Sequence, residues 1–253
     1  MDEYRNLLKN GYGWRARIGF LSPGLVDETV SRQFYQMAPA GVTMVRTSLG
    51  VTALTTDEIS GAISRAEAAA RTLATAQPDC IILGGSPTVV IGGFGYDTEL
   101  RGAIEKASGI PSSTAQTAAV EAFRLLGITR LAVATPFPEP FPTMLGEFLR
   151  RSGFEVLAMD SLSVDYRQLT MAPLRVGYDL ARRTFEAAGQ ADAIYFPGAP
   201  FPVADLIEPL ERELQTTVIS SMQATVWKGL RMAGATDAVI HGYGRLLSTA
   251  LDA

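Results

Sequence analysis

The chain has very few of the side chains that most often carry reactive chemistry. Its 253 residues include one cysteine, Cys80, and one histidine, His241. A single cysteine excludes an internal disulfide and a cysteine-rich zinc site, and a single histidine excludes a multi-histidine metal centre. A Ser-His-Asp triad would need His241, and no Gly-x-Ser-x-Gly motif is present. We therefore expect no metal.

Several other signatures are missing. No Gly-x-Gly-x-x-Gly follows the first strand and no phosphate-binding loop occurs, so we expect no cofactor. The net charge of -4 argues against nucleic acid as a partner. No apolar run approaches the roughly 20 residues that span a bilayer, so we expect no membrane insertion. Because the acidic start, Met1-Asp2-Glu3-Tyr4, does not resemble a signal peptide, we expect a cytoplasmic protein.

The residues that are present predict an α/β fold. Apolar residues make up 47% and charged residues 19%, as in ordinary globular proteins. Strand and helix patterns alternate, which favours parallel sheets with right-handed crossovers. We expect strands near 17–21, 42–47, 80–83, 110–113, 130–134, 154–159, 193–196 and 218–221. Helices are expected near 27–37, 55–76, 97–108, 121–126, 143–151, 172–188, 204–213 and 225–232, with a short helix in a polar leader over 1–14.

The pattern restarts in the middle of the chain. Ile18 matches Leu131 and Gly85 matches Gly198 at one identical spacing, and Ser112 matches Ser220 at a slightly shorter one. Three matches in the same order indicate two similar α/β halves. We expect the first half to comprise 15–117 with 222–253, and the second to comprise 118–221.

In each half, one turn follows the middle strand. The first is Leu83-Gly84-Gly85-Ser86-Pro87, and the second is Phe196-Pro197-Gly198-Ala199. Ligands of α/β sheets bind beyond strand ends, and backbone N–H groups in such turns bind anions. Gly84 and Gly85 let a ligand approach the backbone. The first turn therefore predicts a small-carboxylate site, whereas the alternative is a glycine loop that binds nothing.

Four segments carry a resemblance to a known family: Leu83-Gly84-Gly85-Ser86, Leu131–Thr135, Val218–Ser221 with Trp227, and Gly242–Leu246. Over about residues 15–250 the chain resembles the aspartate/glutamate racemase superfamily, in the branch of arylmalonate decarboxylases and maleate cis-trans isomerases. The resemblance implies two pseudo-symmetric Rossmann-like halves with parallel sheets and an active site in the crevice between them.

The resemblance also places the chemical centre. Racemases and isomerases of this superfamily carry one cysteine after the middle strand of each half, and the decarboxylases keep the second and have glycine at the first. The corresponding residues here are Gly84 and Pro197, so the chain lacks both cysteines. We expect Cys80, at the start of a strand, to be a core residue. Two-cysteine racemisation and a cysteine adduct are therefore excluded.

The resemblance further implies a dioxyanion hole built from both halves. Its positions fall on Gly85, Ser86 and Phe137, of which only Ser86 keeps a hydroxyl side chain. We assign catalysis to Ser86 and Gly85. The substrate-binding candidates are Gly84, Pro23, Phe137, Thr135, Pro197, Gly198, Thr114 and Ser221. The prolines and phenylalanines near 136–141 and 197–202 predict an apolar wall opposite the polar turn. A rigid wall without a ligand is the alternative.

Two classes of function remain open at this stage. The first is a decarboxylase-like lyase that acts on a small carboxylic acid through an enolate or carbanion held by Ser86 and backbone N–H groups. The second is a catalytically degenerate carboxylate-binding protein. Within the enzyme class, the alternative to the lyase is an isomerase or racemase with an acid/base other than cysteine. His241 is either the missing proton donor or part of a structural tail. A homo-oligomer is compatible with the sequence.

Overall fold

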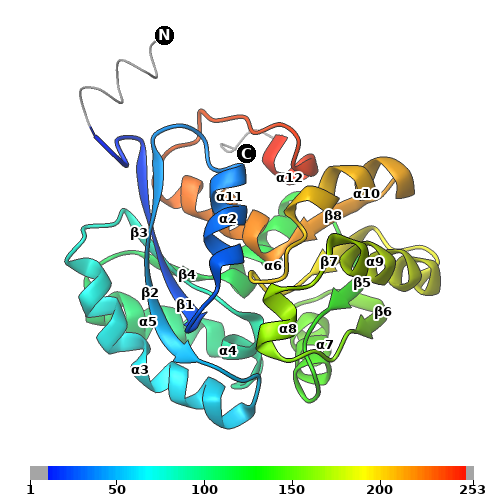
Figure 1. The fold of residues 1–253 in the computed structure, drawn as a ribbon, viewed down its shortest axis with the longest axis horizontal. Coiled ribbons are helices and arrows are strands. Elements are labelled where there is room, and N and C mark those ends of the chain that lie inside the picture. The colour runs from blue at the N-terminus through cyan, green and yellow to red at the C-terminus, as the bar shows by residue number, and fades with distance from the viewer. Residues whose placement is uncertain (1–10, 249–253) are drawn as a thin grey trace.

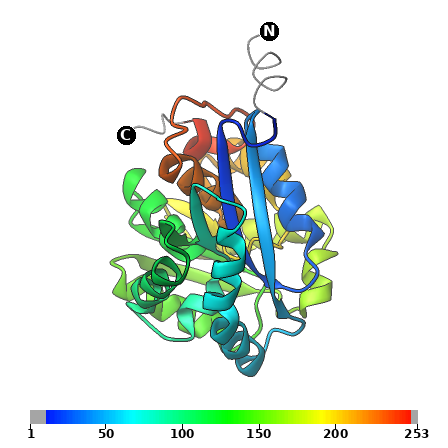
Figure 2. The same cartoon turned by 90° about the vertical axis from the view of Figure 1, so that its left-hand side faces the viewer.

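A computed structural model describes residues 11–248, so most of the predicted leader helix lies outside the described residues. The described part contains two four-stranded parallel sheets, with strand orders β2-β1-β3-β4 and β6-β5-β7-β8. Figures 1 and 2 show one sheet with its helices in each half of the molecule. The predicted α/β class with two parallel sheets is thus confirmed.

The strands and helices follow the alternation expected from the sequence. The strands are β1 (Ala16–Gly24), β2 (Val42–Val51), β3 (Cys80–Leu83), β4 (Ser112–Thr114), β5 (Arg130–Thr135), β6 (Glu155–Ser161), β7 (Ala193–Phe196) and β8 (Thr217–Ser220). The helices are α2 (Glu28–Met37), α3 (Thr56–Ala74), α4 (Ser86–Val90), α5 (Tyr96–Ser108), α6 (Ala115–Leu125), α7 (Phe141–Arg151), α8 (Tyr166–Thr170), α9 (Leu174–Ala188), α10 (Ile207–Leu214), α11 (Ser221–Met232) and α12 (Gly244–Ser248), and a 3-10 turn at Ala204–Leu206 precedes α10.

Helices α6 and α11 begin well before the residues that the sequence pattern predicted. Helix α6 begins at Ala115 because the Thr114 hydroxyl accepts the Thr117 N–H at 2.9 Å. Helix α11 begins at Ser221 because the Ser220 hydroxyl accepts the Gln223 N–H at 3.1 Å. Both are side-chain N-caps. The short helices α4, α8 and α12 were not predicted, and β2 extends beyond the predicted strand to Val51.

The internal repeat extends to individual hydrogen bonds. An aspartate precedes the middle strand of each sheet, and its carboxylate accepts a backbone N–H from the first strand of the same sheet. Asp79 accepts the Arg17 N–H at 2.7 Å, and Asp192 accepts the Arg130 N–H at 2.8 Å. The two aspartates are as far apart in the sequence as the two arginines. The domain boundaries at 117/118 and 221/222 stay a prediction.

We expect Asp192→Asn to lower the free energy of unfolding by about 2 kcal/mol at pH 7, since hydrogen bonds to charged groups contribute this much. The Asp192 carboxylate also accepts from the Thr129 N–H and from the Arg130 guanidinium at 2.8 Å. These bonds hold the pKa of Asp192 well below its usual range. A carboxyl with a lowered pKa stabilises the fold above the pKa of the unfolded chain, about 3.9, and loses that contribution as the pH falls.

Urea denaturation at pH 7 and at pH 3 measures the effect of the Asp192 substitution. The difference from the wild type should shrink at the lower pH. Asp179→Asn is the matched control, because Asp179 forms an exposed pair with Arg175 on one helix and should change stability little. Equal losses for the two variants at pH 7 would contradict the assigned role.

Helices from both halves pack against each other in the centre of the molecule. Helix α11 packs against α2, α6 and β3, and α4 packs against α7 (Figure 1). The buried Tyr195 of β7 lies edge-on to Phe123 of α6, with ring centroids 5.1 Å apart. The crevice between the sheets is therefore lined by well-packed elements on both sides.

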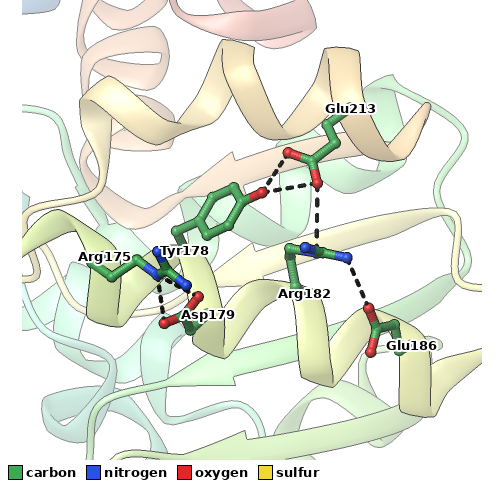
Figure 3. A network of polar contacts seen from close by, with 6 residues as sticks. All are labelled: Arg175, Tyr178, Asp179, Arg182, Glu186 and Glu213. Atoms are coloured by element: carbon green, nitrogen blue, oxygen red, sulfur yellow. Dashed lines mark hydrogen bonds and ion pairs between the residues drawn. The ribbon is translucent and has the colours of Figure 1, made fainter.

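A polar network lies on the outside of the second half and joins α9 to α10 (Figure 3). The Tyr178 hydroxyl donates to Glu213 at 2.7 and 2.9 Å, and Arg182 pairs with the same carboxylate at 3.5 Å. Arg175 and Asp179 form a further pair on α9. Because the ion pairs of this network are solvent-exposed, the network contributes modestly to stability.

Candidate functional site

A narrow pocket with a cavity volume of about 20 Å³ lies between the two halves. Its lining is mainly apolar and comes from both sheets. The first half contributes Phe20, Pro23, Val30, Val51, Leu54, Ile59, Gly85, Pro87 and Thr88, and the second contributes Phe137, Tyr166, Leu169, Gly198, Ala199 and Pro200. Apolar pockets with few polar groups are the usual form of a small-molecule site.

The glycine turn borders this pocket on the side of the first sheet, through Gly85, Pro87 and Thr88. The Gly84 N–H donates to Leu21 O at 2.9 Å, which fixes the turn against β1. Gly85 has a φ of 83°, a conformation that favours glycine, and directly precedes α4. The Thr88 hydroxyl donates to Gly85 O at 2.6 Å, so it supports the turn. Ser86 is 1% exposed, and its hydroxyl has no hydrogen-bond partner of standard geometry within residues 11–248.

Packing explains why glycine stands at position 84. A Cβ at this position would lie 2.4 Å from Cζ of Phe20, which is buried and lines the pocket. Real Cβ atoms do not approach other atoms this closely. The space that a side chain at position 84 would need is therefore filled by the Phe20 ring.

The second turn is apolar, as the sequence predicted. Pro197 is buried. Gly198 has a φ of 96°, and a Cβ at this position would lie only 2.9 Å from Phe137 Cζ, which is too close. The Phe137 N–H donates to the Thr135 hydroxyl at 3.3 Å. Phe137 therefore presents its ring to the pocket, while its backbone N–H is used within its own turn.

The ten predicted site residues fall into three groups. Those that line the pocket are Pro23, Gly85, Phe137 and Gly198. Those that adjoin a lining residue in sequence are Gly84, Ser86 and Pro197. The remaining three, Thr114, Thr135 and Ser221, are fully buried and do not line it. The Thr114 hydroxyl is occupied in capping α6. The catalytic and substrate-binding roles of all ten stay predictions.

Sequence reasoning missed Tyr166, which α8 brings into the pocket from the second half. Its ring lines the pocket, and its buried hydroxyl lies against the backbone of Gly24, where a Cβ would be only 1.7 Å away. Burial, followed by the charge of Asp27, raises the pKa of Tyr166. Asp165 and Gln168 form a capping box at the start of α8, and this Asp-x-x-Gln spacing was the signal available in the sequence.

A buried carboxylate close to the pocket was also missed. Asp27 is 1% exposed, accepts a hydrogen bond from the Ser22 hydroxyl and pairs with Arg46 at 2.5 Å. Burial raises the pKa of Asp27 and outweighs the opposite effects of Ser22 and Arg46. This cluster joins the end of β1, the start of α2 and β2 behind the pocket wall.

The chain's cysteine and histidine lie away from the pocket lining. Cys80 is fully buried, as predicted, with Sγ 3.8 Å from Gly229 O, and burial raises the pKa of its thiol to about 12. His241 belongs to the C-terminal segment and is absent from the residues that line the pocket. The same segment is tied down by Gln223, whose amide donates to Tyr243 O at 2.6 Å.

The family model described as arylmalonate decarboxylase matches residues 18–247. The chain belongs to the arylmalonate decarboxylase family. It is 28% identical over 233 residues to arylmalonate decarboxylase of Bordetella bronchiseptica, an alignment that covers 90% of this chain and 95% of that one. This agrees with the resemblance drawn from the glycine turn and the C-terminal segment.

Two solved structures illustrate the likeness of this arylmalonate decarboxylase family member. A liganded double mutant of arylmalonate decarboxylase, with glycine changed to cysteine and cysteine to serine, has a TM-score of 0.84 at 26% identity and covers 92% of this chain and 98% of its own. A Nocardia farcinica maleate cis-trans isomerase mutant with a covalently bound succinylcysteine intermediate has a TM-score of 0.85 at 23% identity, with the same coverage. The second likeness shows the fold alone. None of the helices between residues 11 and 248 is long and apolar enough to cross a bilayer.

Proposed function

We propose that this family member is a cofactor-independent lyase that releases carbon dioxide from a small malonate-type acid carrying an apolar group. The observation that carries the proposal is the two-sided pocket. Gly85 of the glycine turn, which directly precedes Ser86, lines one side, and Phe137, Gly198 and Leu169 line the other. Membership of the arylmalonate decarboxylase family supports the same class of substrate.

The chemistry divides between the two sides of the pocket. The departing carboxylate lies against the apolar wall, where it is poorly solvated. Its conversion to neutral carbon dioxide is favoured there because the charge is lost from an apolar environment. The bond from the α-carbon to this carboxylate breaks, and its electron pair moves into the remaining carboxylate as an enediolate. Backbone N–H groups of Gly85 and Ser86, with the Ser86 hydroxyl, stabilise the negative oxygens. A proton from water then bonds to the α-carbon.

Lyase chemistry is favoured over isomerisation because the first turn carries glycine in place of cysteine, as the resemblance implies for the decarboxylases. Gly84 and Pro197 stand at the two turns, and the buried Cys80 lies outside the pocket lining. A cysteine adduct of the kind named for the Nocardia isomerase has no nucleophile here. The same lack of a thiol favours the second candidate, a carboxylate-binding protein without turnover.

We expect Ser86→Ala to lower kcat/KM for phenylmalonate by about 100-fold, since loss of one preorganised oxyanion donor has this effect. Carbon dioxide release is followed by NMR over a panel of malonates and maleate. Ser113→Ala is the control, because Ser113 is equally buried but neither lines the pocket nor adjoins a lining residue in sequence, and it should leave kcat/KM unchanged.

The possible results separate the candidates. Turnover that is indifferent to Ser86→Ala would show that the glycine turn is not the site. No turnover on any acid, together with thermal stabilisation by one of them, would favour the binding protein. Conversion of maleate to fumarate without carbon dioxide release would favour an isomerase.

A further inference from the structure

One face of α2 forms hydrogen bonds from the first half to the second. Figure 1 shows this helix in the centre of the molecule. Thr29, Gln33 and Gln36 are spaced as i, i+4 and i+7, so they share one face of α2. All three side chains bond to residues 199–205, which extend from the end of the second turn. The segment that carries the second turn is therefore held by a helix of the opposite half.

The side chain of Gln33 is paired at both ends. Gln33 Oε1 accepts the Val203 N–H at 2.9 Å and the Ala204 N–H at 3.0 Å. Gln33 Nε2 donates to Ala199 O at 2.8 Å. Because two N–H donors face one end of the amide and a carbonyl faces the other, a single orientation of the amide satisfies all three contacts. Gln33 is 3% exposed, so this buried amide fixes the segment 199–204 in place.

Thr29 pairs the next carbonyl along the segment. Its buried hydroxyl donates to Pro200 O at 2.7 Å. Ala199 and Pro200 both line the pocket, whereas Thr29 and Gln33 do not. The carbonyl oxygens of these two wall residues therefore bond to side chains that lie behind the pocket lining.

Helix α2 is itself fixed to the first sheet. Asp27, directly before α2, pairs with Arg46 of β2 at 2.5 Å and accepts a hydrogen bond from the Ser22 hydroxyl of β1. Val30, which follows Thr29, lines the pocket. The first turn of α2 thus contacts the first sheet, the pocket and the opposite wall, so it relates the positions of all three.

We propose that Thr29 and Gln33 are positioning residues that hold the apolar wall in place and keep its carbonyl oxygens away from the bound acid. A carbonyl oxygen carries a partial negative charge, so a free one beside a carboxylate repels it. Without the Thr29 hydroxyl, Pro200 O is a buried acceptor without a partner, and the segment shifts to relieve that cost. This rests on the proposed function, because it assumes that an acid binds against this wall.

We expect Thr29→Val to raise KM for phenylmalonate about tenfold and to leave kcat nearly unchanged, since one buried hydrogen bond corresponds to a change of this size. The wall contacts the substrate and the transition state alike, and loss of such uniform binding changes KM and not kcat. Thr29→Ser keeps the hydroxyl and should keep the wild-type KM. Steady-state kinetics of carbon dioxide release measures both constants.

Thr184→Val is the matched control. Thr184 is buried, and its hydroxyl donates to Leu180 O at 2.7 Å within α9, away from the pocket lining. This variant removes the same kind of bond and should leave KM unchanged. The urea midpoints of both valine variants are measured, so that a loss of stability is separated from an effect on the wall. An equal KM for Thr29→Val and Thr184→Val would overturn the positioning role and leave the lyase standing.

Two further measurements need no turnover. Hydrogen exchange followed by mass spectrometry should be faster over residues 199–206 in Thr29→Val than in Thr184→Val, and equal exchange would overturn the hold of α2 on this segment. If no acid is turned over, the proposed function fails, and phenylacetate binding is measured by NMR of the ligand. Weaker binding in Thr29→Val than in Thr29→Ser would then support the positioning role, and equal binding would overturn it.

Discussion

Replacement of Pro197 by cysteine is expected to raise the rate of carbon dioxide release from an arylmalonate by about 100-fold or more, because a positioned general acid contributes this much. Pro197 has no titratable group and adjoins Gly198 and Ala199, which line the pocket. The resemblance places the decarboxylase cysteine at this turn. A thiol there would deliver a proton to the α-carbon of the enediolate, in place of water.

A thiol on one wall of the pocket also delivers its proton to only one face of the planar α-carbon of the enediolate. With methyl(phenyl)malonate as substrate, the product carries a new stereocentre, and Pro197→Cys should form one enantiomer in excess. Chiral chromatography of the product measures this directly. Pro197→Ser is the control, because it removes the same ring without supplying an acid of comparable strength. Equal rates for the cysteine and serine variants would show that the second turn is not the proton-donating wall.

Cysteine at the opposite turn should have the reverse effect. Gly84→Cys places a Cβ 2.4 Å from Phe20 Cζ and 3.1 Å from its two ε-carbons. The Phe20 ring is buried and lines the pocket, so its displacement both strains the core and narrows the site. We expect a loss of about 1–3 kcal/mol in unfolding free energy, as for other overpacked cores, together with lower activity.

A second substitution tests this steric explanation. Phe20→Leu shortens the side chain that Gly84→Cys meets, so the double variant should be more stable than Gly84→Cys alone. Urea denaturation of the four proteins gives the coupling energy. Gly102→Cys is the control, because a Cβ on Gly102 meets nothing within 4 Å. A Gly84→Cys protein as stable as Gly102→Cys would contradict the clash.

The two cysteine substitutions are expected to have opposite effects because the two turns of the repeat have different surroundings. In a relative, one double mutant has a glycine changed to cysteine and a cysteine changed to serine. Here, Phe20 lies against the first turn, and the Phe137 ring lies against the second. We therefore expect that a racemase-like pair of thiols would need changes at Phe20 as well as at the two turns.

The fold could be predicted because its signals are local. Short apolar runs end in glycine or proline, and matching residues at a constant spacing relate the two halves. The missed helix starts have a clear cause. The first turn of α6 contains the polar residues Gln116 and Thr117, so it lacks the apolar periodicity by which a helix is recognised. Thr114, the N-cap, was the remaining signal for the start of this helix. Burial of such polar residues depends on the second half, which a local pattern does not contain.

The site could be predicted only in part for the same reason. The glycine turn is a continuous motif, and so its place beside the pocket followed from the sequence. Tyr166 reaches the pocket from a short helix and lies against Gly24, which is far earlier in the chain. Asp27 is buried because Arg46 of the neighbouring strand pairs with it. Such contacts arise only when distant segments meet.

The burial of Cys80 makes the natural chain unreactive toward thiol reagents in its folded state. The chain has no second cysteine, and a thiol whose pKa is about 12 forms almost no thiolate at neutral pH. Any cysteine introduced at the pocket would therefore be the sole fast-reacting nucleophile. Its alkylation, counted by mass spectrometry, would report how freely reagents enter the crevice, without prior removal of a native cysteine.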